Sequence, residues 1–275
     1  MCIRDSHNRI PFRRLSEAGI DGLDRTSVFE QTMMLAITAT FLVAGMVKGI
    51  IGLGLPTVTL AVFAVIFDLP TAMVLLIVPS FVTNLWQALA GPNLLIIVRR
   101  LWLFLLCATL TIGMAASAAA SMDVKWMTSL LGVLLIVYAS SNLAGLRLSF
   151  SQVQERWYGP LLGILNGIAT GMTGSFVVPG VLFLQALGLD RHVLVQAMGI
   201  LFTLSTAALA IALHQRDFMV SSLSLLSVAG VIPAVVGMVI GAAIRKRITE
   251  QQFRRTFFVA LLVLGAYLLA TSFAS

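Results

Sequence analysis

Apolar residues dominate the chain beyond residue 31, where they form ten segments of 13 to 24 residues separated by short polar stretches. A helix needs about 20 predominantly apolar residues to cross the hydrocarbon core of a bilayer. The pattern therefore predicts an all-α, polytopic integral membrane protein with 8–10 transmembrane segments. The apolar segments cover residues 32–47, 53–67, 71–89, 101–120, 127–146, 158–170, 175–187, 193–213, 221–244 and 257–273.

A polar stretch at residues 147–157 divides the apolar region into two halves of similar layout, each opening with two short, glycine-broken segments. We expect a first transmembrane repeat over 32–146, a cytoplasmic linker at 147–157 and a second transmembrane repeat over 158–275. Residues 1–31 have mixed charge and lack the apolar run of a signal peptide, so they predict a soluble leader. The opening MCIRDS resembles translated sequencing-adapter read-through, and no function is inferred from it.

The two halves also match each other residue by residue. With a shift of 120, eight of the 37 positions from 54 to 90 are identical, including Gly54/Gly174 and Thr83/Thr203. Apolar composition alone gives about half that number of identities. Five segments per half is an odd number, which predicts inverted repeats of the kind found in many secondary transporters. If each short pair is one re-entrant element, the number of segments falls to eight.

Composition and charge narrow the class of protein. The chain is 59% hydrophobic and 11% charged, with a mean hydropathy of +1.00 and a net charge of +7. In a soluble protein such a charge suggests nucleic-acid binding, but here it lies in short loops, where it sets orientation. We therefore expect no nucleic-acid partner. The basic loop at 245–255 predicts a cytoplasmic position, with the C-terminus periplasmic, in the bacterial cytoplasmic (inner) membrane.

Signatures of catalysis are missing from the sequence. The three histidines have no metal-ligand spacing, and neither HExxH nor GxSxG occurs. We expect no enzyme activity, no cofactor and no metal site.

Glycine-rich blocks at 47–59 (VKGIIGLGLPTVT) and 166–180 (NGIATGMTGSFVVPG) carry the main functional signal. Breaks in a membrane helix are tolerated only where they face protein or a wet cavity. A helix that restarts after a break presents free N–H groups and a partial positive charge, which suit a small anion. Hydroxyls of Thr57, Thr59, Thr173 and Ser175 add donors, and two such ends are expected to meet near the midplane. The alternative is that the glycines serve close helix packing, because several have GxxxG spacing.

Three further polar positions lie in or beside apolar segments. Lys48 adjoins the first break, where it either balances an anionic substrate or reaches the membrane interface. Asn166 occupies the comparable place in the second half. Asn84 and Gln87 lie three apart on one helix face and either line the path or, for Gln87, sit at an interface. The candidate substrate-binding residues are Lys48, Gly52, Gly54, Pro56, Thr57, Asn84, Gln87, Asn166, Gly171, Thr173, Gly174 and Ser175.

Residues 33 to 274 resemble the two repeats of the sulfite exporter TauE/SafE family of membrane transporters. The resemblance lies in the glycine-rich block that opens each half and ends in a proline, at Gly49, Gly52, Gly54 and Pro56 and again at Gly167, Gly171, Gly174 and Pro179. It implies a secondary transporter that exports or imports a small anion such as sulfite or an organosulfonate. The rival interpretations are a non-transporting membrane scaffold or partner subunit and an anion channel. The expected partners are the small anionic substrate and the lipid bilayer, and a homo-oligomer is left open.

Overall fold

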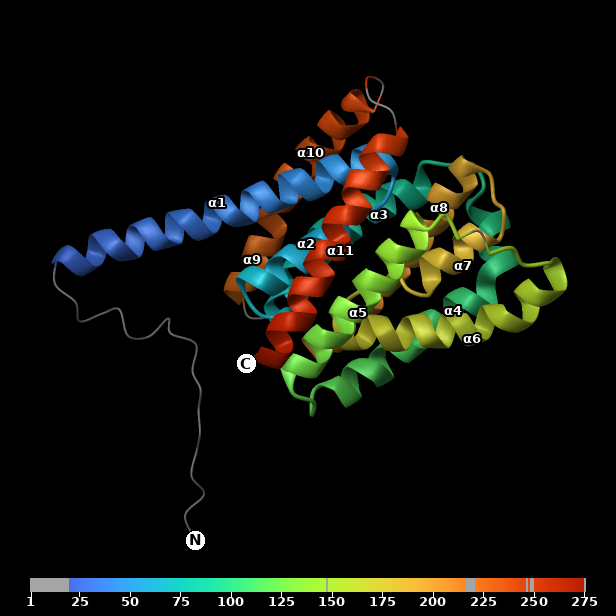
Figure 1. Ribbon diagram of the computed structural model, residues 1–275, viewed down its shortest axis with the longest axis horizontal. Helices are drawn as coiled ribbons and strands as arrows, with labels where there is room; N and C mark the ends of the chain where they lie inside the picture. Colours follow the sequence, from blue (N-terminus) through green and yellow to red (C-terminus); the bar gives the residue numbers. More distant parts are fainter. Residues whose placement is uncertain (1–19, 147, 216–220, 246, 248–249, 275) are drawn as a thin grey trace, which may run out of the picture. The chain divides into compact units, whose positions relative to one another are not determined.

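The computed structural model describes residues 20–146, 148–215, 221–245, 247 and 250–274. The described residues divide between Ala39 and Thr40 into two units, and the one from Thr40 onward contains α2 to α11. The described residues form eleven helices and no strand (Figure 1). Their bounds are α1 Ile20–Ile51, α2 Leu55–Ile66, α3 Leu69–Leu89, α4 Leu94–Ala119, α5 Val124–Leu143, α6 Gln152–Thr173, α7 Gly180–Ala186, α8 Arg191–His214, α9 Ser221–Ala229, α10 Val231–Ile244 and α11 Glu250–Ala274.

The helices confirm the predicted class, an all-α polytopic membrane fold. Seven helical stretches among the described residues are long and apolar enough to cross a bilayer, with α9 and α10 counted together as 223–244. Each predicted apolar segment corresponds to helix, with two differences. The segment at 221–244 is divided at Gly230, and residues 175–179 are non-helical before α7. Helix α6 also begins at Gln152, so the second part of the predicted linker is helical.

Two helix pairs run parallel and pack through glycines. Along α6, a Cβ on Gly163 would lie 2.5 Å from the Phe104 carbonyl oxygen of α4, and one on Gly171 would lie 2.4 Å from that of Ile112. Helix α10 packs on the last part of α1 in the same way, since a Cβ on Gly45 would lie 2.1 Å from the Ala234 carbonyl oxygen. The GxxxG spacings therefore do serve close packing in these pairs.

Two other pairs run antiparallel. Near the start of α8, Gln196 donates from Nε2 to the carbonyl oxygen of Ala88, close to the end of α3, at 2.8 Å. Helices α5 and α11 meet at Gly132 and Gly265, where a Cβ on Gly132 would lie 2.8 Å from the other glycine's carbonyl oxygen. Further along this pair, Arg254 donates to Asn142 at 3.3 Å.

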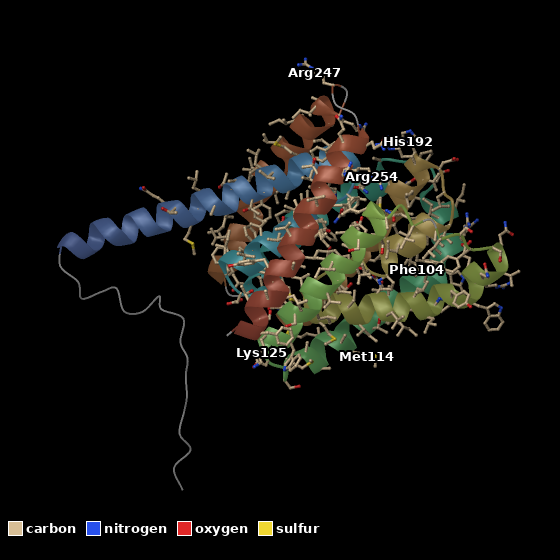
Figure 2. All side chains as sticks on the ribbon, viewed as in Figure 1. Phe104, Met114, Lys125, His192, Arg247 and Arg254 are labelled. Carbon is tan, nitrogen blue, oxygen red and sulfur yellow. The ribbon has the colours of Figure 1, made fainter. Side chains whose placement is uncertain are left out.

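These pairings bring the described arginines of α4, α6, α8 and α11 to one end of the bundle, which we call the basic end. Helices α3, α5 and α10 finish there, and α4, α6, α8 and α11 begin there. Figure 2 shows Arg247 and Arg254 toward this end and Lys125 at the opposite one. The described arginines near the basic end are Arg99, Arg100, Arg156, Arg191, Arg245, Arg247, Arg254 and Arg255.

Both glycine breaks adjoin α2, at different points along that helix. Gly54, with φ 116°, caps α2, and the neighbouring Gly52 faces Val195, in the second turn of α8 near the basic end. Gly174, with φ 72°, caps the end of α6 and faces Met73, in the second turn of α3 near the other end. The positive φ angles explain why glycine occupies these positions. Gly174 also faces the Leu60 side chain, in the second turn of the helix that Gly54 caps, and the expectation that the two ends meet near the midplane stays a prediction.

Candidate anion-binding site

Lys48 is the charged residue at the centre of the candidate site. It lies in the last turn of α1 and is 3% exposed. Its ammonium donates to Thr83 Oγ1 at 3.2 Å and to the amide oxygen of Asn84, both on α3. The ion pairs of the described residues are Arg100–Glu155 and Lys125–Asp123. Within that part of the chain, Lys48 is thus a buried cation without a carboxylate partner.

A line of hydrogen bonds continues from Lys48 into the middle of the bundle. Asn84 Nδ2 donates to Ser80 Oγ at 3.0 Å, and Ser80 Oγ lies 3.3 Å from Thr206 Oγ1 on α8. Thr206 donates its own hydroxyl hydrogen to the Phe202 carbonyl oxygen at 2.6 Å, so Ser80 is the donor to Thr206. We call this set, Lys48, Thr83, Asn84, Ser80 and Thr206, the buried polar chain; its members are all buried.

The direction of donation along this chain is fixed by its first residue. An ammonium has three N–H donors and no acceptor, so the amide oxygen of Asn84 must face Lys48 and the amide nitrogen must face Ser80. Two of the three Lys48 donors are used, by Thr83 and Asn84. One donor of the ammonium remains for another partner.

The local sequence of α3 explains how the chain is positioned. Ser80 and Asn84 are four residues apart and therefore lie on one face of the helix, toward α8. Pro79 has no N–H and leaves the Leu75 carbonyl oxygen without its helical donor. Ser227 of α9 replaces that donor, since its hydroxyl donates to Leu75 O at 2.8 Å and accepts from the Val78 N–H at 3.1 Å. The proline is thus accommodated within the protein interior, as a membrane helix requires.

Polar residues of the second half form a separate group around the second break. Asn166 on α6 accepts the Gly180 N–H at 2.9 Å with its amide oxygen. Thr170 donates to the Ser175 carbonyl oxygen at 3.0 Å, and Thr173 accepts the Ser175 N–H at 3.2 Å. These bonds satisfy backbone groups that the break exposes. The Asn166 amide nitrogen and the Ser175 hydroxyl are buried and have no hydrogen-bond partner within the part of the chain that the structure describes.

The remaining predicted site residues differ in what surrounds them. Gln87 donates to the Val195 carbonyl oxygen at 2.6 Å and has no hydrogen bond to the buried polar chain. Gly171 packs against the α4 backbone. Thr57, behind Pro56 in the first turn of α2, is buried. Gly52 is tied to Lys48 through the backbone, donating its N–H to the Lys48 carbonyl oxygen at 2.7 Å.

Sequence reasoning missed Ser80, Thr83 and Thr206 as members of the site. A signal existed for two of them. Ser80 precedes Asn84 by one helical turn, and Thr83 is one of the positions identical between the halves. Thr206 lay in an apolar segment where a lone hydroxyl is commonly satisfied by its own helix, so nothing marked it.

The chemistry of this arrangement suits an anion. Removing an ammonium from water costs several kcal/mol even after the protein relaxes, and hydroxyl and amide contacts compensate only part of that. Three further buried hydroxyls have no hydrogen-bond partner among the described residues: those of Thr59 on α2, Ser205 beside Thr206 and Tyr138 on α5. The described residues contain no cluster of three His, Cys, Asp or Glu side chains that suits a metal ion.

Comparisons with known proteins give one result. No curated protein and no solved structure matches the chain. The family model of the sulfite exporter TauE/SafE matches residues 37–268, which contain every helix from α2 to α10, most of α11 and all of the buried polar chain. The breaks, the glycine-packed helix pairs and the buried lysine are thus features of a protein that belongs to the sulfite exporter TauE/SafE family.

Proposed function

We propose that the chain is a secondary transporter that moves a small oxyanion, sulfite or an organosulfonate, across the bacterial cytoplasmic membrane, with Lys48 as the charge that binds it. The observation that carries the proposal is a lysine buried at membrane depth with hydroxyl and amide neighbours and no carboxylate among the described residues. Ionisable residues in such positions mark substrate pathways. Membership of the TauE/SafE family supports the same substrate class.

The helix pairings support inverted repeats. Under the shift of 120 residues, α3 corresponds to α8 and α5 to α11, and each of these pairs is antiparallel. The same correspondence relates the parallel pair α1 and α10 to the parallel pair α6 and α4. Rocking of one half against the other would open the site to each side in turn. All four helix pairs cross between the halves, and the α3–α8 pair is the one that the buried polar chain joins.

The basic end is proposed to face the cytoplasm. Short cytoplasmic loops carry an excess of Lys and Arg, and the described arginines near the helix ends favour this orientation. Helix α11 begins at the basic end, so the C-terminus would be periplasmic. Lys48 would then lie closer to the cytoplasmic side, since its partners Thr83 and Asn84 are in the last two turns of α3.

The test is flux through the purified protein in liposomes. Uptake of labelled sulfite is measured with competing sulfonates and carboxylates, and with and without pH and sodium gradients. Uptake that saturates with sulfite concentration and is inhibited by competing sulfonates would support a transporter. Its dependence on the pH or the sodium gradient would identify the coupling ion. Conductance without saturation would indicate a channel.

A scaffold would give neither flux nor binding. A bound ligand raises the stability of the native state by RT ln(1 + [L]/Kd), about 2.7 kcal/mol at a hundred times Kd. Folded protein whose thermal stability is the same with and without sulfite or sulfonates, and which gives no flux under any gradient, would overturn the proposal.

A further inference from the structure

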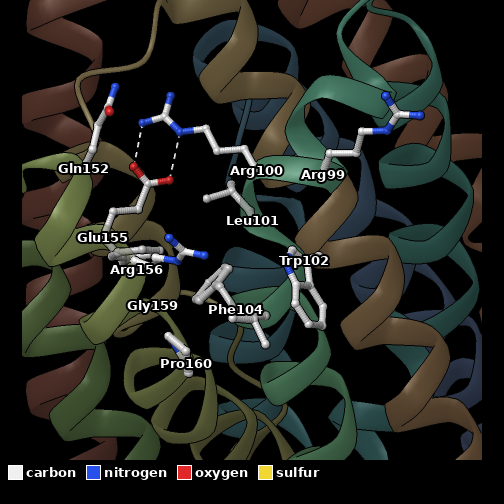
Figure 3. A pocket seen from close by; sticks show the side chains of 12 residues that line it. Arg99, Arg100, Leu101, Trp102, Phe104, Gln152, Glu155, Arg156, Gly159 and Pro160 are labelled. Atoms are coloured by element: carbon white, nitrogen blue, oxygen red, sulfur yellow. Dashed lines mark hydrogen bonds and ion pairs between the residues drawn. The ribbon is translucent and has the colours of Figure 1, made fainter.

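A second basic site lies outside the buried polar chain, at the basic end between α4 and α6. A hollow of about 460 Å³ opens there, lined by side chains of both helices. Its basic residues are Arg99, Arg100 and Arg156, and its floor includes Phe104 and Phe183, both buried. Figure 3 shows Arg156 reaching from α6 toward Phe104, while Arg100 turns to Glu155.

The charges in this hollow are not balanced. Glu155 is its one carboxylate, and Arg100 holds both oxygens, with Nε to Oε1 at 2.8 Å and an Nη to Oε2 at 2.7 Å. This bidentate pair engages both carboxylate oxygens and balances the charge of Glu155 with that of Arg100. Arg99 and Arg156 are exposed and have no ion pair among the described residues. Two guanidinium groups without an ion pair in the described part of the chain thus line the hollow, Arg156 reaching toward Phe104 and Arg99 on the other side, pointing away from Glu155 (Figure 3).

The faces that lead away from the hollow are apolar and point outward. On α4, Arg99 belongs to a line of exposed residues spaced three or four apart that continues with Trp102, Leu106 and Leu110. On α6, Trp157 and Leu161 are exposed in the turns that follow Arg156. Apolar outward faces in a membrane helix contact acyl chains, and tryptophan is enriched at the level of the headgroups.

We propose that the hollow binds an anionic glycerophospholipid, with the phosphodiester held by Arg99 and Arg156 and the acyl chains lying along the outer faces of α4 and α6. Guanidinium groups bind phosphate oxygens with two parallel hydrogen bonds. Basic pockets between transmembrane helices suit such headgroups. A free anion would use the arginines alone, whereas a phospholipid also uses the apolar faces beside them. This site does not depend on the proposed transport function.

The experiment is lipid binding to the delipidated full-length protein, followed by native mass spectrometry and by thermal unfolding. The probes are phosphatidylglycerol, phosphatidylcholine, inorganic phosphate and sulfite. We expect phosphatidylglycerol to bind and to raise the unfolding temperature. Arg99→Gln with Arg156→Gln should weaken this binding about 25-fold, because one arginine near an anionic lipid accounts for about five-fold. Arg245→Gln with Arg255→Gln is the matched control, removing two charges at the same end of the bundle, and should change binding less than two-fold.

A variant with the opposite effect guards against loss of folding. Glu155→Gln releases the Arg100 guanidinium into the hollow, so we expect it to bind phosphatidylglycerol about five-fold more tightly. Weaker binding in this variant would overturn the proposal. So would equal binding of phosphatidylcholine, equal loss in the control pair, or stabilisation by inorganic phosphate or sulfite that Arg99→Gln with Arg156→Gln abolishes. The last result would assign the hollow to a free anion.

Discussion

The Lys48 ammonium donates to the amide oxygen of Asn84, and the amide nitrogen of Asn84 donates in turn to the Ser80 hydroxyl. One neutral side chain thus connects the buried cation to the hydroxyls at the middle of α3 and α8. The cation is held in place without being neutralised. A site for an exchangeable anion requires this arrangement, in which neutral side chains position the ammonium and its charge is left for the anion to balance.

Replacing Lys48 by methionine should abolish anion binding and flux. Methionine keeps the unbranched apolar shape but removes the charge, so the anion-dependent rise in unfolding temperature should disappear. Without ligand, the variant no longer has the desolvation cost of a buried charge, but the Asn84 amide oxygen loses its hydrogen bond. Because these two effects on stability have opposite signs, we expect the unfolding temperature to change by only a few degrees. Lys125→Met, at an exposed position on the opposite end, is the control and should retain flux. Sulfite-dependent stabilisation that survives in Lys48→Met would contradict the assignment.

Asn84→Asp should produce a protein that carries its own counter-ion. The carboxylate would sit where the amide oxygen now contacts Lys48 and would neutralise the ammonium. We expect the fold to be at least as stable as the wild type, while affinity for sulfite falls at least ten-fold. Asn84→Leu removes the hydrogen bonds without adding charge, so it should be less stable yet bind better than Asn84→Asp. Titrations of both variants, followed by thermal unfolding with and without ligand, would compare them. The idea fails if Asn84→Asp binds as the wild type does.

Thr206→Val tests the far end of the buried polar chain. The substitution is close to isosteric and leaves the Ser80 hydroxyl without its acceptor, which costs about 1–3 kcal/mol in a buried site. The matched control is Thr203→Val on the same helix, because Thr203 donates only to the Gly199 carbonyl oxygen of α8 itself. We expect the first variant to unfold at a lower temperature than the second and to lose flux more strongly. Equal unfolding temperatures and equal flux in the two variants would mean that the Ser80–Thr206 hydrogen bond contributes nothing to stability or transport.

Two glycines in the α4–α6 pair should respond oppositely to alanine. A Cβ on Gly171 would lie 2.4 Å from the Ile112 carbonyl oxygen, so the helices must separate, at a cost of about 1–3 kcal/mol. A Cβ on Gly113 would meet nothing within 4 Å, and alanine is the better helix former by about 1 kcal/mol. The unfolding temperature should therefore be lower than that of the wild type for Gly171→Ala and equal or higher for Gly113→Ala. An equal decrease in both variants would reject the packing role of Gly171.

Sequence periodicity predicted the helices well because each apolar segment had to satisfy its backbone within the membrane. The glycines were harder to assign. Gly54 and Gly171 look alike in the sequence, yet one has a positive φ and caps a helix while the other permits contact between two helices. Only the partner helix distinguishes them, and the sequence does not name the partner.

The candidate site was predictable at Lys48 and Asn84, because polar residues within apolar segments are few. Gln87 shared a helix face with Asn84, but it satisfies a backbone carbonyl of α8 instead. Thr206 could not be found, since its role depends on the antiparallel register of α3 and α8. Residues within one helix are thus accessible to spacing arguments, whereas those that complete a site across helices are not.

Ser227 has a mechanical consequence for any motion of α3. Its hydroxyl donates to the Leu75 carbonyl oxygen and accepts from the Val78 N–H, so two hydrogen bonds join α9 to the turn of α3 that Pro79 interrupts. If α3 slid alone, two backbone groups would be stranded in a medium with no water to receive them. We therefore expect α9 to move with the first half of α3, although α9 belongs to the proposed second repeat. The boundary between moving parts need not coincide with the boundary between the repeats.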